Sequence, residues 1–250
     1  MKKQEIIKIK GFNEILANNI LDKGKRENLG TYIENMQKQA VDIVTIEDEE
    51  YPQILKNIYD YPVSLYCKGN KNILNEISFG IIGCREASSY GIKAAQYFSY
   101  HLAQKGSNVI SGLAKGIDSY AHIGALKANG KTIGVIGCGL DIIYPKENQY
   151  VYEKILKQNG AIVSEYPLGE EVKKMHFPQR NRIISGISKG IIVIEAKKKS
   201  GTLITVDFAL EQGKDVYVVP GNINSINSVG TNNLIKQGAK IVTTVEDIDF

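Results

Sequence analysis

The most constraining feature of this sequence is the alternation, from Tyr51 onward, of short β-rich apolar runs with longer amphipathic helical windows. Such alternation is typical of βαβ units, which build a parallel sheet with helices packed on it. The run Gly190–Ile194 has no polar position, which indicates a strand that is covered on both faces. The expected strands are Val63–Cys67, Ser78–Ile82, Asn108–Ile110, Thr132–Ile136, Ala161–Ser164, Gly190–Ile194, Val216–Val219 and Lys240–Val242.

Helices are expected between these strands, where apolar residues recur at helical spacing. The sequence therefore predicts an α/β fold of the extended Rossmann-like kind, with a mostly parallel, doubly wound sheet that carries helices on both faces. The expected helices are Ser89–Gln104, Asp118–Asn129, Glu147–Gln158, Arg180–Ile187, Leu203–Gln212 and Thr231–Gln237.

The first part of the chain has a different pattern. Over residues 1–48 the apolar positions follow helical spacing throughout, as in Tyr32, Ile33 and Met36. We expect a short helical region over residues 1–48 and the sheet domain over residues 49–250. Residues 9–21 weakly resemble a helix-hairpin-helix, a motif that binds backbone phosphates, but a second hairpin glycine is missing. A helical cap is therefore the preferred interpretation of this region.

The composition adds few limits. A chain of 250 residues, 43% hydrophobic and 23% charged, is expected to form one main globular domain with a small appendage. A net charge of +4 is mild, so contact with a polyanion must come from local clusters of cations. Cys67, Cys84 and Cys138 lack metal-ligand spacing and are expected to be buried, reduced thiols. We expect no metal, no cofactor and no membrane span, and a cytoplasmic location.

One helix start combines fixed charge with free backbone donors. The stretch Phe177–Gly186 places Arg180, Asn181 and Arg182 at the expected start of a helix. Helix N-termini present N–H groups without intrahelical partners, and arginine forks onto phosphate oxygens. The stretch therefore predicts a phosphate-binding site.

Three further loops that follow expected strands have the same character. In such a fold, ligands bind beyond the carboxyl ends of the strands, where these loops meet. A row of phosphate sites along one sheet edge indicates a nucleic-acid strand as the ligand. The loops offer Gly83 and Arg85 after the strand Ser78–Ile82, Ser111, Gly112, Lys115 and Gly116 after the strand Asn108–Ile110, and Ser200, Gly201 and Thr202 after three lysines.

Catalytic and dinucleotide interpretations are weaker. The loop with Gly137 and Gly139 carries Ile142 where a dinucleotide fingerprint needs its third glycine. Asp118 and His122 lie four residues apart on one expected helix, so a carboxylate–imidazole pair is possible, but a role in fixing the helix to a neighbouring loop is preferred. No catalytic residue is predicted.

Several longer motifs occur in a fixed order along the chain. They are Tyr51-Pro52, Leu65-Tyr66-Cys67-Lys68-Gly69, Gly83-Cys84-Arg85, Ser111-Gly112-Leu113-Ala114-Lys115-Gly116-Ile117-Asp118, Ser164-Glu165, Phe177-Pro178-Gln179-Arg180-Asn181-Arg182, Ser200-Gly201-Thr202-Leu203-Ile204-Thr205 and Pro220-Gly221. With these motifs the chain, from Tyr51 to about Ile248, resembles the DNA-processing protein A (DprA/Smf) family, which supports natural transformation in bacteria.

The resemblance implies an extended Rossmann domain that binds single-stranded DNA through its phosphates, forms a homodimer and helps to place the recombinase RecA on the strand, without catalysis. The family's phosphate-binding positions carry over to Arg85, the Gly112–Gly116 loop, Lys174, Arg180, Arg182 and Ser200–Thr202. Its self-association region carries over to Asn232, Ile235 and Ile241. The family's winged-helix-like C-terminal domain is not expected here, and its sterile-alpha-motif-like N-terminal region is expected to be short.

The main alternative is a Rossmann-type hydrolase, similar to the nucleoside-monophosphate phosphoribohydrolases. Their loop reads Pro-Gly-Gly-x-Gly-Thr followed by a catalytic glutamate. The comparable stretch here, Ser200–Thr205, has no glutamate. The sequence therefore favours a binding protein over a hydrolase.

Two finer expectations concern the ligand and the assembly. Contacts from arginines, hydroxyls and amides, without an aromatic stacking array, predict binding of single-stranded DNA with little base specificity, through exposed arginines that contribute little to packing. Leu234, Ile235, Ile241 and Val242 form an apolar cluster that predicts a homodimer through the last helix and strand. The alternative is that Leu234 and Val242 are ordinary core residues.

Overall fold

The chain divides into two compact units, Met1–Ala40 and Val41–Phe250. The computed structural model describes Glu14 and residues 29–250. In the first unit the described helix is α4 (Leu29–Lys38), which contains the predicted helical positions Tyr32, Ile33 and Met36. The weak helix-hairpin-helix pattern of residues 9–21 lies outside the described residues, apart from Glu14.

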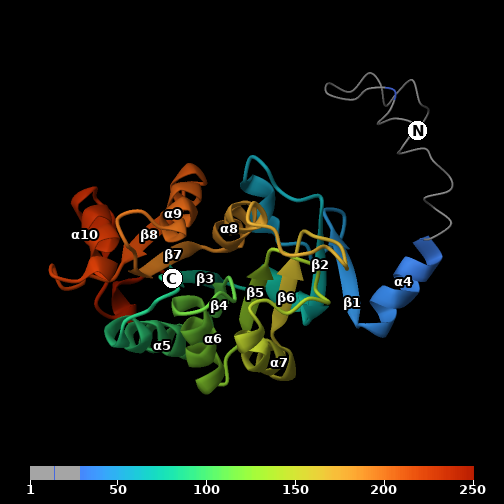
Figure 1. Cartoon of the computed structure of the whole chain (residues 1–250), viewed down its shortest axis with the longest axis horizontal. Helices are drawn as coiled ribbons and strands as arrows, with labels where there is room; N and C mark the ends of the chain where they lie inside the picture. The colour runs from blue at the N-terminus through green and yellow to red at the C-terminus, as the bar shows by residue number, and fades with distance from the viewer. Residues whose placement is uncertain (1–13, 15–28) are drawn as a thin grey trace. The chain divides into compact units, whose positions relative to one another are not determined.

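The second unit is built on a nine-stranded sheet, counted over the described residues, with the order β1-β2-β6-β5-β4-β3-β7-β8-β9 (Figure 1). Strands β3 to β9 pair in parallel, whereas β2 is antiparallel to both β1 and β6. The predicted mostly parallel α/β sheet is thereby confirmed. The strands are β1 (Val41–Thr45), β2 (Ser64–Gly69), β3 (Ser78–Gly83), β4 (Asn108–Ser111), β5 (Thr132–Ile136), β6 (Ala161–Ser164), β7 (Gly190–Glu195), β8 (Asp215–Val218) and β9 (Lys240–Ile241).

The strand order reverses at β3. From β3 the chain runs outward through β4, β5 and β6, and it then returns to β7 on the other side of β3. Loops that leave β3 and β7 therefore diverge to opposite faces of the sheet. This divergence opens a crevice beyond their carboxyl ends, which is where open α/β sheets bind ligands.

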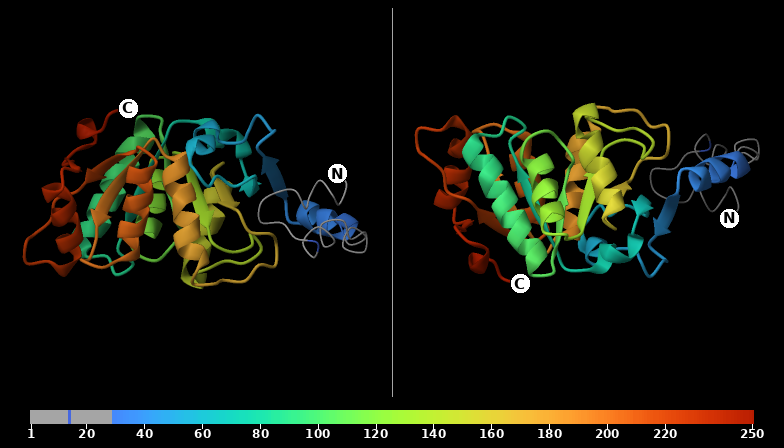
Figure 2. Two further views of the ribbon diagram at one scale, coloured as in Figure 1. Left: turned by 90° about the horizontal axis from the view of Figure 1, so that it is seen from above. Right: turned by 90° about the horizontal axis from the view of Figure 1, so that it is seen from below.

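Helices cover both faces of the sheet, as expected for a doubly wound fold. In Figure 1 and Figure 2, α5, α6 and α7 lie on one face, and α8, α9 and α10 lie on the other. The helices are α5 (Ser89–Gln104), α6 (Ile117–Lys127), α7 (Gln149–Lys157), α8 (His176–Ile187), α9 (Gly201–Glu211) and α10 (Val229–Lys236), with short 3-10 turns η1 (Gln53–Asn57), η2 (Lys71–Asn75), η3 (Lys146–Asn148), η4 (Ile226–Ser228) and η5 (Val245–Asp247).

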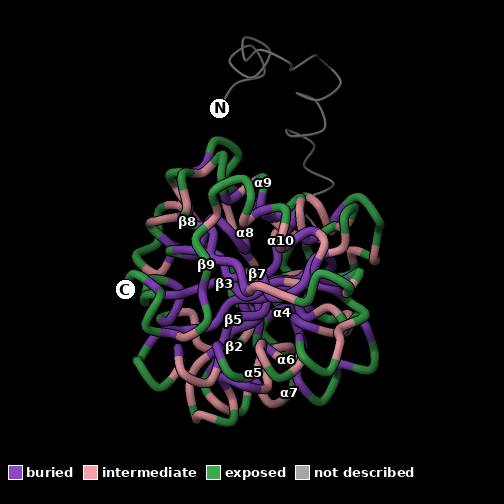
Figure 3. Tube along the Cα trace, turned by 90° about the vertical axis from the view of Figure 1, so that its left-hand side faces the viewer, coloured by how far each residue is buried: buried purple, intermediate pink, exposed green. Residues whose placement is uncertain are grey.

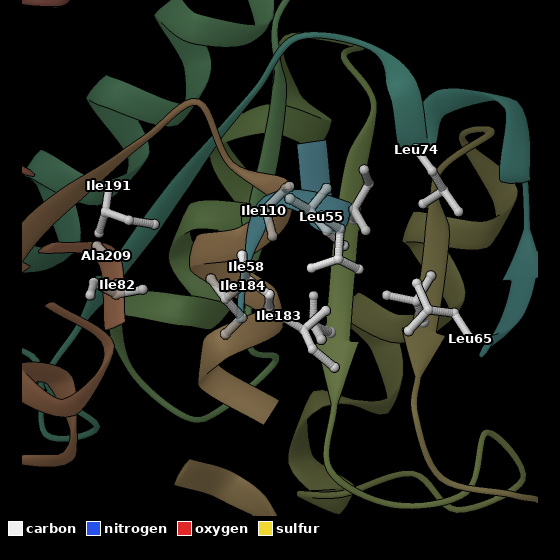
Figure 4. Close-up of a cluster of buried hydrophobic side chains, with 14 of the residues drawn as sticks. Leu55, Ile58, Leu65, Leu74, Ile82, Ile110, Ile183, Ile184, Ile191 and Ala209 are labelled. Atoms are coloured by element: carbon white, nitrogen blue, oxygen red, sulfur yellow. The ribbon is translucent and has the colours of Figure 1, made fainter. Parts of the chain in front are cut away.

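The sheet separates two apolar clusters, one under each layer of helices. Figure 4 shows part of the larger cluster, in which Leu55 and Ile58 from the η1 region meet Ile183 and Ile184 of α8. All six positions of β7 are buried, which agrees with its unbroken apolar run. Figure 3 shows the strands as a buried centre and the loops as exposed segments. The rigid centre fixes the positions of the loops at the carboxyl edge.

One strand lies where the sequence analysis placed only helix. Strand β1 falls inside the region predicted to be helical, and the two units divide after Ala40 rather than near residue 48. The strand pairs with β2 over five residues and buries only Val41 and Val44 fully. This spacing of three between buried residues is typical of a helix, and a short edge strand can adopt it because half of its surface faces solvent.

Candidate nucleic-acid interface

A cleft of about 660 Å³ lies at the reversal point of the strand order. Its walls come from the loop after β3, the start of α8 and the start of α9. Four basic side chains line it, against two acidic ones. Most of the predicted phosphate contacts line this cleft, namely Gly83, Arg85, Lys174, Arg180, Asn181, Ser200, Gly201 and Thr202.

A smaller cavity of about 100 Å³ shares Arg85, Phe177 and Arg180 with the cleft. Gly112 and Lys115, two further predicted contacts, line this smaller cavity. The two spaces therefore adjoin, and together they bring loops from β3, β4, α8 and α9 to one place. Ser111, Gly116 and Arg182 line neither of them.

Two exposed cations in the cleft are free to meet a ligand. Arg85 and Lys174 are both exposed, and among the described residues neither has a carboxylate partner within ion-pair distance. The Arg85 guanidinium lies over the Phe177 ring, 5.4 Å from its centroid. An arginine held on an aromatic face keeps its N–H edge available for an anion.

Arg180 occupies a different environment. Only 4% of it is exposed, and its Nη1 donates to the carbonyl oxygen of Gly112 at 2.6 Å and also to that of Val135. Burial lowers the pKa of Arg180 to about 10, while the buried Asp118 opposes this shift, so the side chain stays charged at neutral pH. The expectation that Arg180 is exposed and contributes little to packing is wrong, because this guanidinium ties α8 to the ends of β4 and β5.

Arg180 also has a donor without a partner. Its Nε is buried and makes no hydrogen bond, and the same is true of the Ser200 hydroxyl on the neighbouring wall. Burying a polar group without a partner is costly, so such groups point to a ligand or water that completes them. Both residues line the cleft.

Arg182 lies outside the cleft and is paired. Its Nε donates to Asp60 at 3.0 Å and its Nη2 to Glu165 at 2.7 Å. These bonds connect α8 to the loop before β2 and to the end of β6. The structure therefore gives Arg182 a role in holding the fold around the cleft, and does not bring it to the ligand space.

Two other predicted contacts have structural roles. The Ser111 hydroxyl is buried and donates to the carbonyl oxygen of Ile81 at 2.6 Å. Gly116 has φ of +76°, and a Cβ there would lie 2.3 Å from the carbonyl oxygen of Arg85. A side chain at Gly116 would thus push away the loop that carries Arg85. Both residues support the cleft without facing it.

The first turns of two helices, α8 and α9, line the cleft. α8 spans 12 residues and α9 spans 11. Ser200 precedes α9 but makes no capping bond through its side chain, and a Cβ at Gly201 would meet nothing within 4 Å. The Leu203 N–H of the first turn donates to the Ser200 carbonyl oxygen at 3.1 Å. The start of α9 lines the cleft, where the helix dipole favours an anion.

An aromatic pair in the cleft was not predicted. The rings of Tyr144 and Phe177 lie 5.8 Å apart at 40°, and both residues line the cleft and the smaller cavity. The sequence analysis expected no aromatic stacking array, whereas the structure places this ring pair in the cleft. The two residues are 33 positions apart in the chain, so only the fold brings them together. Exposed rings beside cations provide stacking surfaces for nucleobases.

Three lysines around the cleft are already paired. Lys115 contacts Glu147, Lys197 contacts Glu86, and Lys173 contacts Glu170, each at 2.5 Å. A paired lysine offers less net charge to a phosphate than a free one.

The residues considered for catalysis are engaged elsewhere. His122 is fully buried, its Nδ1 lies 2.7 Å from the Thr132 hydroxyl, and burial lowers its pKa to about 3. Asp118 accepts from the backbone N–H of Ala114 at 3.4 Å. The two side chains thus bond to separate neighbours, as the preferred interpretation expected. Across residues 29–250, no three His, Cys, Asp or Glu side chains gather as a metal site would need.

The predicted self-association residues differ in exposure. Leu234 and Val242 are buried, as the alternative interpretation held. Ile241 is 52% exposed, Ile235 is partly buried against the core, and the Asn232 amide bonds to Gly221. Among the described helices, none is long and apolar enough to cross a membrane.

The fold and the cleft define a Rossmann-like α/β protein with a cationic crevice at its switch point. The family model for DNA recombination-mediator protein A matches residues 42–249. This chain belongs to that family, and the resemblance drawn from the sequence motifs is confirmed.

Relatives cover most of the chain. DNA processing protein DprA of Bacillus subtilis is 42% identical over 213 residues, which span 85% of this chain and 71% of that protein. The X-ray structure of DNA processing protein A from Streptococcus pneumoniae has a TM-score of 0.91 at 38% identity and covers 100% of this chain and 88% of its own. The structure of DNA processing protein A from Helicobacter pylori, described for its single-stranded DNA binding mode, has a TM-score of 0.75 at 32% identity, over 82% of this chain and 93% of its own.

Proposed function

We propose that this protein binds single-stranded DNA through its phosphates, in natural transformation and recombination, and that it does so without catalysis. The observation that carries this proposal is the pair of exposed, unpaired cations, Arg85 and Lys174, in a cleft that also holds two aromatic rings. Cations spaced along a cleft suit successive phosphates, and the rings suit the bases between them.

The cleft favours single-stranded over double-stranded DNA because its aromatic rings are accessible only to unpaired bases. A ring pair inside a crevice can stack only on bases that have left a duplex. Phosphate contacts read no sequence, and stacking tolerates every base. The protein therefore binds single strands in preference to duplex and has little base specificity.

The arrangement also supports binding rather than reaction. The acidic groups of the cleft are Glu86, which pairs with Lys197, and Asp118, which is buried beside Arg180. Burial raises the pKa of the Cys84 thiol, which makes it a poor nucleophile. The cleft therefore presents donors that hold an anion, and no free base beside a nucleophile.

Assembly forms the second part of the proposal. Ile241 lies on the two-residue edge strand β9 and is 52% exposed, so it offers an apolar contact at the edge of the sheet to a second copy. A homodimer through Ile235, Ile241 and Asn232 joins two clefts, so a long strand engages both and gains effective concentration. The bound strand is then handed to RecA, which agrees with membership of a recombination-mediator family.

A gel-shift titration tests the DNA proposal. Single-stranded and duplex oligonucleotides of one sequence are compared at two salt concentrations, and tight binding only to the single strand is expected. Equal binding to blunt-ended duplex would contradict the proposal. Light scattering tests the assembly, since Ile241→Glu is expected to give a folded monomer. The handover to RecA is expected to appear as faster RecA filament formation on strands coated with single-strand-binding protein.

A further inference from the structure

We propose that the exposed face of α5 forms a second single-strand contact, which continues the path of DNA out of the cleft. The inference rests on the proposed function, because it takes the strand in the cleft as its starting point. It adds a binding surface of its own, made by Tyr90, Lys93, Tyr97 and His101 and called the α5 stripe below.

The residues of the α5 stripe lie on one side of the helix. Tyr90, Tyr97 and His101 stand seven and four residues apart, so they lie within about 40° of one another around the helix axis. Tyr90 is 50% exposed and Tyr97 is 38% exposed, while the opposite side of α5 is buried. The Tyr97 and His101 rings lie 4.5 Å apart. The stripe therefore presents aligned rings to solvent over about 16 Å, the length of roughly five nucleotides at duplex spacing.

The charge of the helix suits a polyanion. α5 contains no acidic residue in its 16 positions, whereas the exposed Lys93 stands between Tyr90 and Tyr97 in the sequence. Helix α7 provides a contrast within the same layer. Its exposed Tyr150 has Lys154 over the ring, but Glu153 lies on the same helix and Glu147 comes just before it. Of these two helices, α5 is the one that combines exposed rings and a cation without a carboxylate in its own sequence.

The stripe is continuous with the cleft. α5 begins four residues after Arg85, and Figure 2 shows the helix running along the outside of its layer. Between the cleft and the stripe lies a depression of about 440 Å³, lined by Ser88, Tyr90 and Asn222 among others. The Tyr90 hydroxyl donates to the carbonyl oxygen of Pro220 at 2.7 Å, which fixes the ring at the border of this depression. The depression carries hydroxyl and amide groups, no lysine or arginine, and the buried carboxylate of Glu195, which accepts from the Ser88 N–H at 3.0 Å and from the Ser88 hydroxyl. This lining suits a sugar or base rather than a phosphate.

The occupant is single-stranded DNA that extends beyond the cleft. Stacking of bases on Tyr90 and Tyr97 needs unpaired bases, and Lys93 supplies the phosphate contact between them. A short oligonucleotide that fills only the cleft does not reach the stripe. Length dependence therefore separates the two surfaces.

A fluorescence experiment reads the stripe directly, because the chain contains no tryptophan. Tyr97→Trp places a single reporter on α5, and Tyr150→Trp places a matched one on α7. Oligothymidylates of roughly 6 and roughly 20 nucleotides are titrated; the first lies near the lower end and the second beyond the upper end of the site sizes of about 4–16 nucleotides found for single-strand-binding OB folds. We expect the emission of Tyr97→Trp to fall with the long oligonucleotide only, and that of Tyr150→Trp to stay constant.

Affinity supplies the second readout. Tyr97→Ala is expected to weaken binding of the long oligonucleotide about tenfold, the size of one base–aromatic stack, and to leave the short one unchanged. Tyr97→Phe keeps the ring and is expected to bind like the wild type. If the wild type binds both oligonucleotides while Tyr97→Ala binds the long one equally well and the reporter stays constant, the stripe is not a DNA contact. If the wild type binds neither, the proposed function itself fails.

Discussion

The two arginines that line the cleft, Arg85 and Arg180, differ in what surrounds them. Arg85 is exposed and has no acidic partner among the described residues, whereas Arg180 is 4% exposed and bonds to two carbonyl oxygens from other strands. Both residues belong to motifs that predict phosphate contact. The comparison shows that an arginine in such a motif can bond to the protein's own backbone instead of lying exposed in the cleft.

The same difference separates residues proposed to bind DNA from residues that hold the fold together. Arg180 and Arg182 fasten α8 to the loops around it, and Arg85 and Lys174 project from elements that are thereby held in place. Three predictions test this division between structural and DNA-binding residues. Each separates an effect on protein stability from an effect on DNA affinity.

The largest effect is expected from Arg180→Ala. The change removes a buried cation, leaves the carbonyl oxygens of Gly112 and Val135 without their donor and leaves Asp118 uncompensated. Breaking such a buried arrangement costs about 3–5 kcal/mol of the free energy of unfolding. Chemical denaturation measures this loss, with Arg85→Ala as the matched control that unfolds like the wild type. An Arg180→Ala protein as stable as the wild type contradicts the division.

A smaller effect, on binding alone, is expected from Arg85→Ala. Loss of one charge-assisted contact weakens binding by about 1.5–3 kcal/mol, or roughly tenfold to a hundredfold. Fluorescence anisotropy with a labelled single strand measures the change. Lys127→Ala, on the exposed part of α6 away from the cleft lining, serves as the control. Unchanged affinity in Arg85→Ala removes this residue from the interface.

The smallest effect concerns lysines that differ in pairing. Lys174 has no carboxylate partner within the part of the chain that the structure describes, whereas Lys115 contacts Glu147 at 2.5 Å. Lys174→Ala is expected to cost about 1 kcal/mol of binding and Lys115→Ala less, since surface pairs and contacts are of this order. Glu147→Gln frees Lys115 and is expected to raise affinity slightly. The same titration checks all three variants, and a larger loss in Lys115→Ala than in Lys174→Ala reverses the ranking.

The fold could be predicted from the sequence to a large extent, because buried parallel strands such as Thr132–Ile136 and Gly190–Ile194 appear as unbroken apolar runs. Strand β1 could not, since its buried residues follow the spacing of a helix and its pairing partner lies beyond Ser64. The local apolar pattern identifies a strand when the residues that form the pattern are the ones the fold buries.

The sequence predicted which loops form the site, but not the side-chain contacts within it. Arg85 and Ser200 follow strands at the carboxyl edge, so the rule of carboxyl-end loops found them, whereas Lys174 was predicted from the resemblance to the family. The burial of Arg182 depends on Asp60 and Glu165, and the aromatic pair depends on Tyr144 meeting Phe177. Such partners are far apart in sequence, so no local sequence pattern predicts their contact.

The salt dependence of DNA affinity tests the central claim most directly, namely that Arg85 in the cleft neutralises a phosphate. The affinity of the wild type and of Arg85→Ala for one single-stranded oligonucleotide is measured over a range of salt concentrations. For single strands the log–log slope is about −0.7 for each phosphate neutralised, so Arg85→Ala is expected to lower its magnitude by about 0.7. A wild-type affinity that does not depend on salt, or identical slopes for the two proteins, contradicts the account.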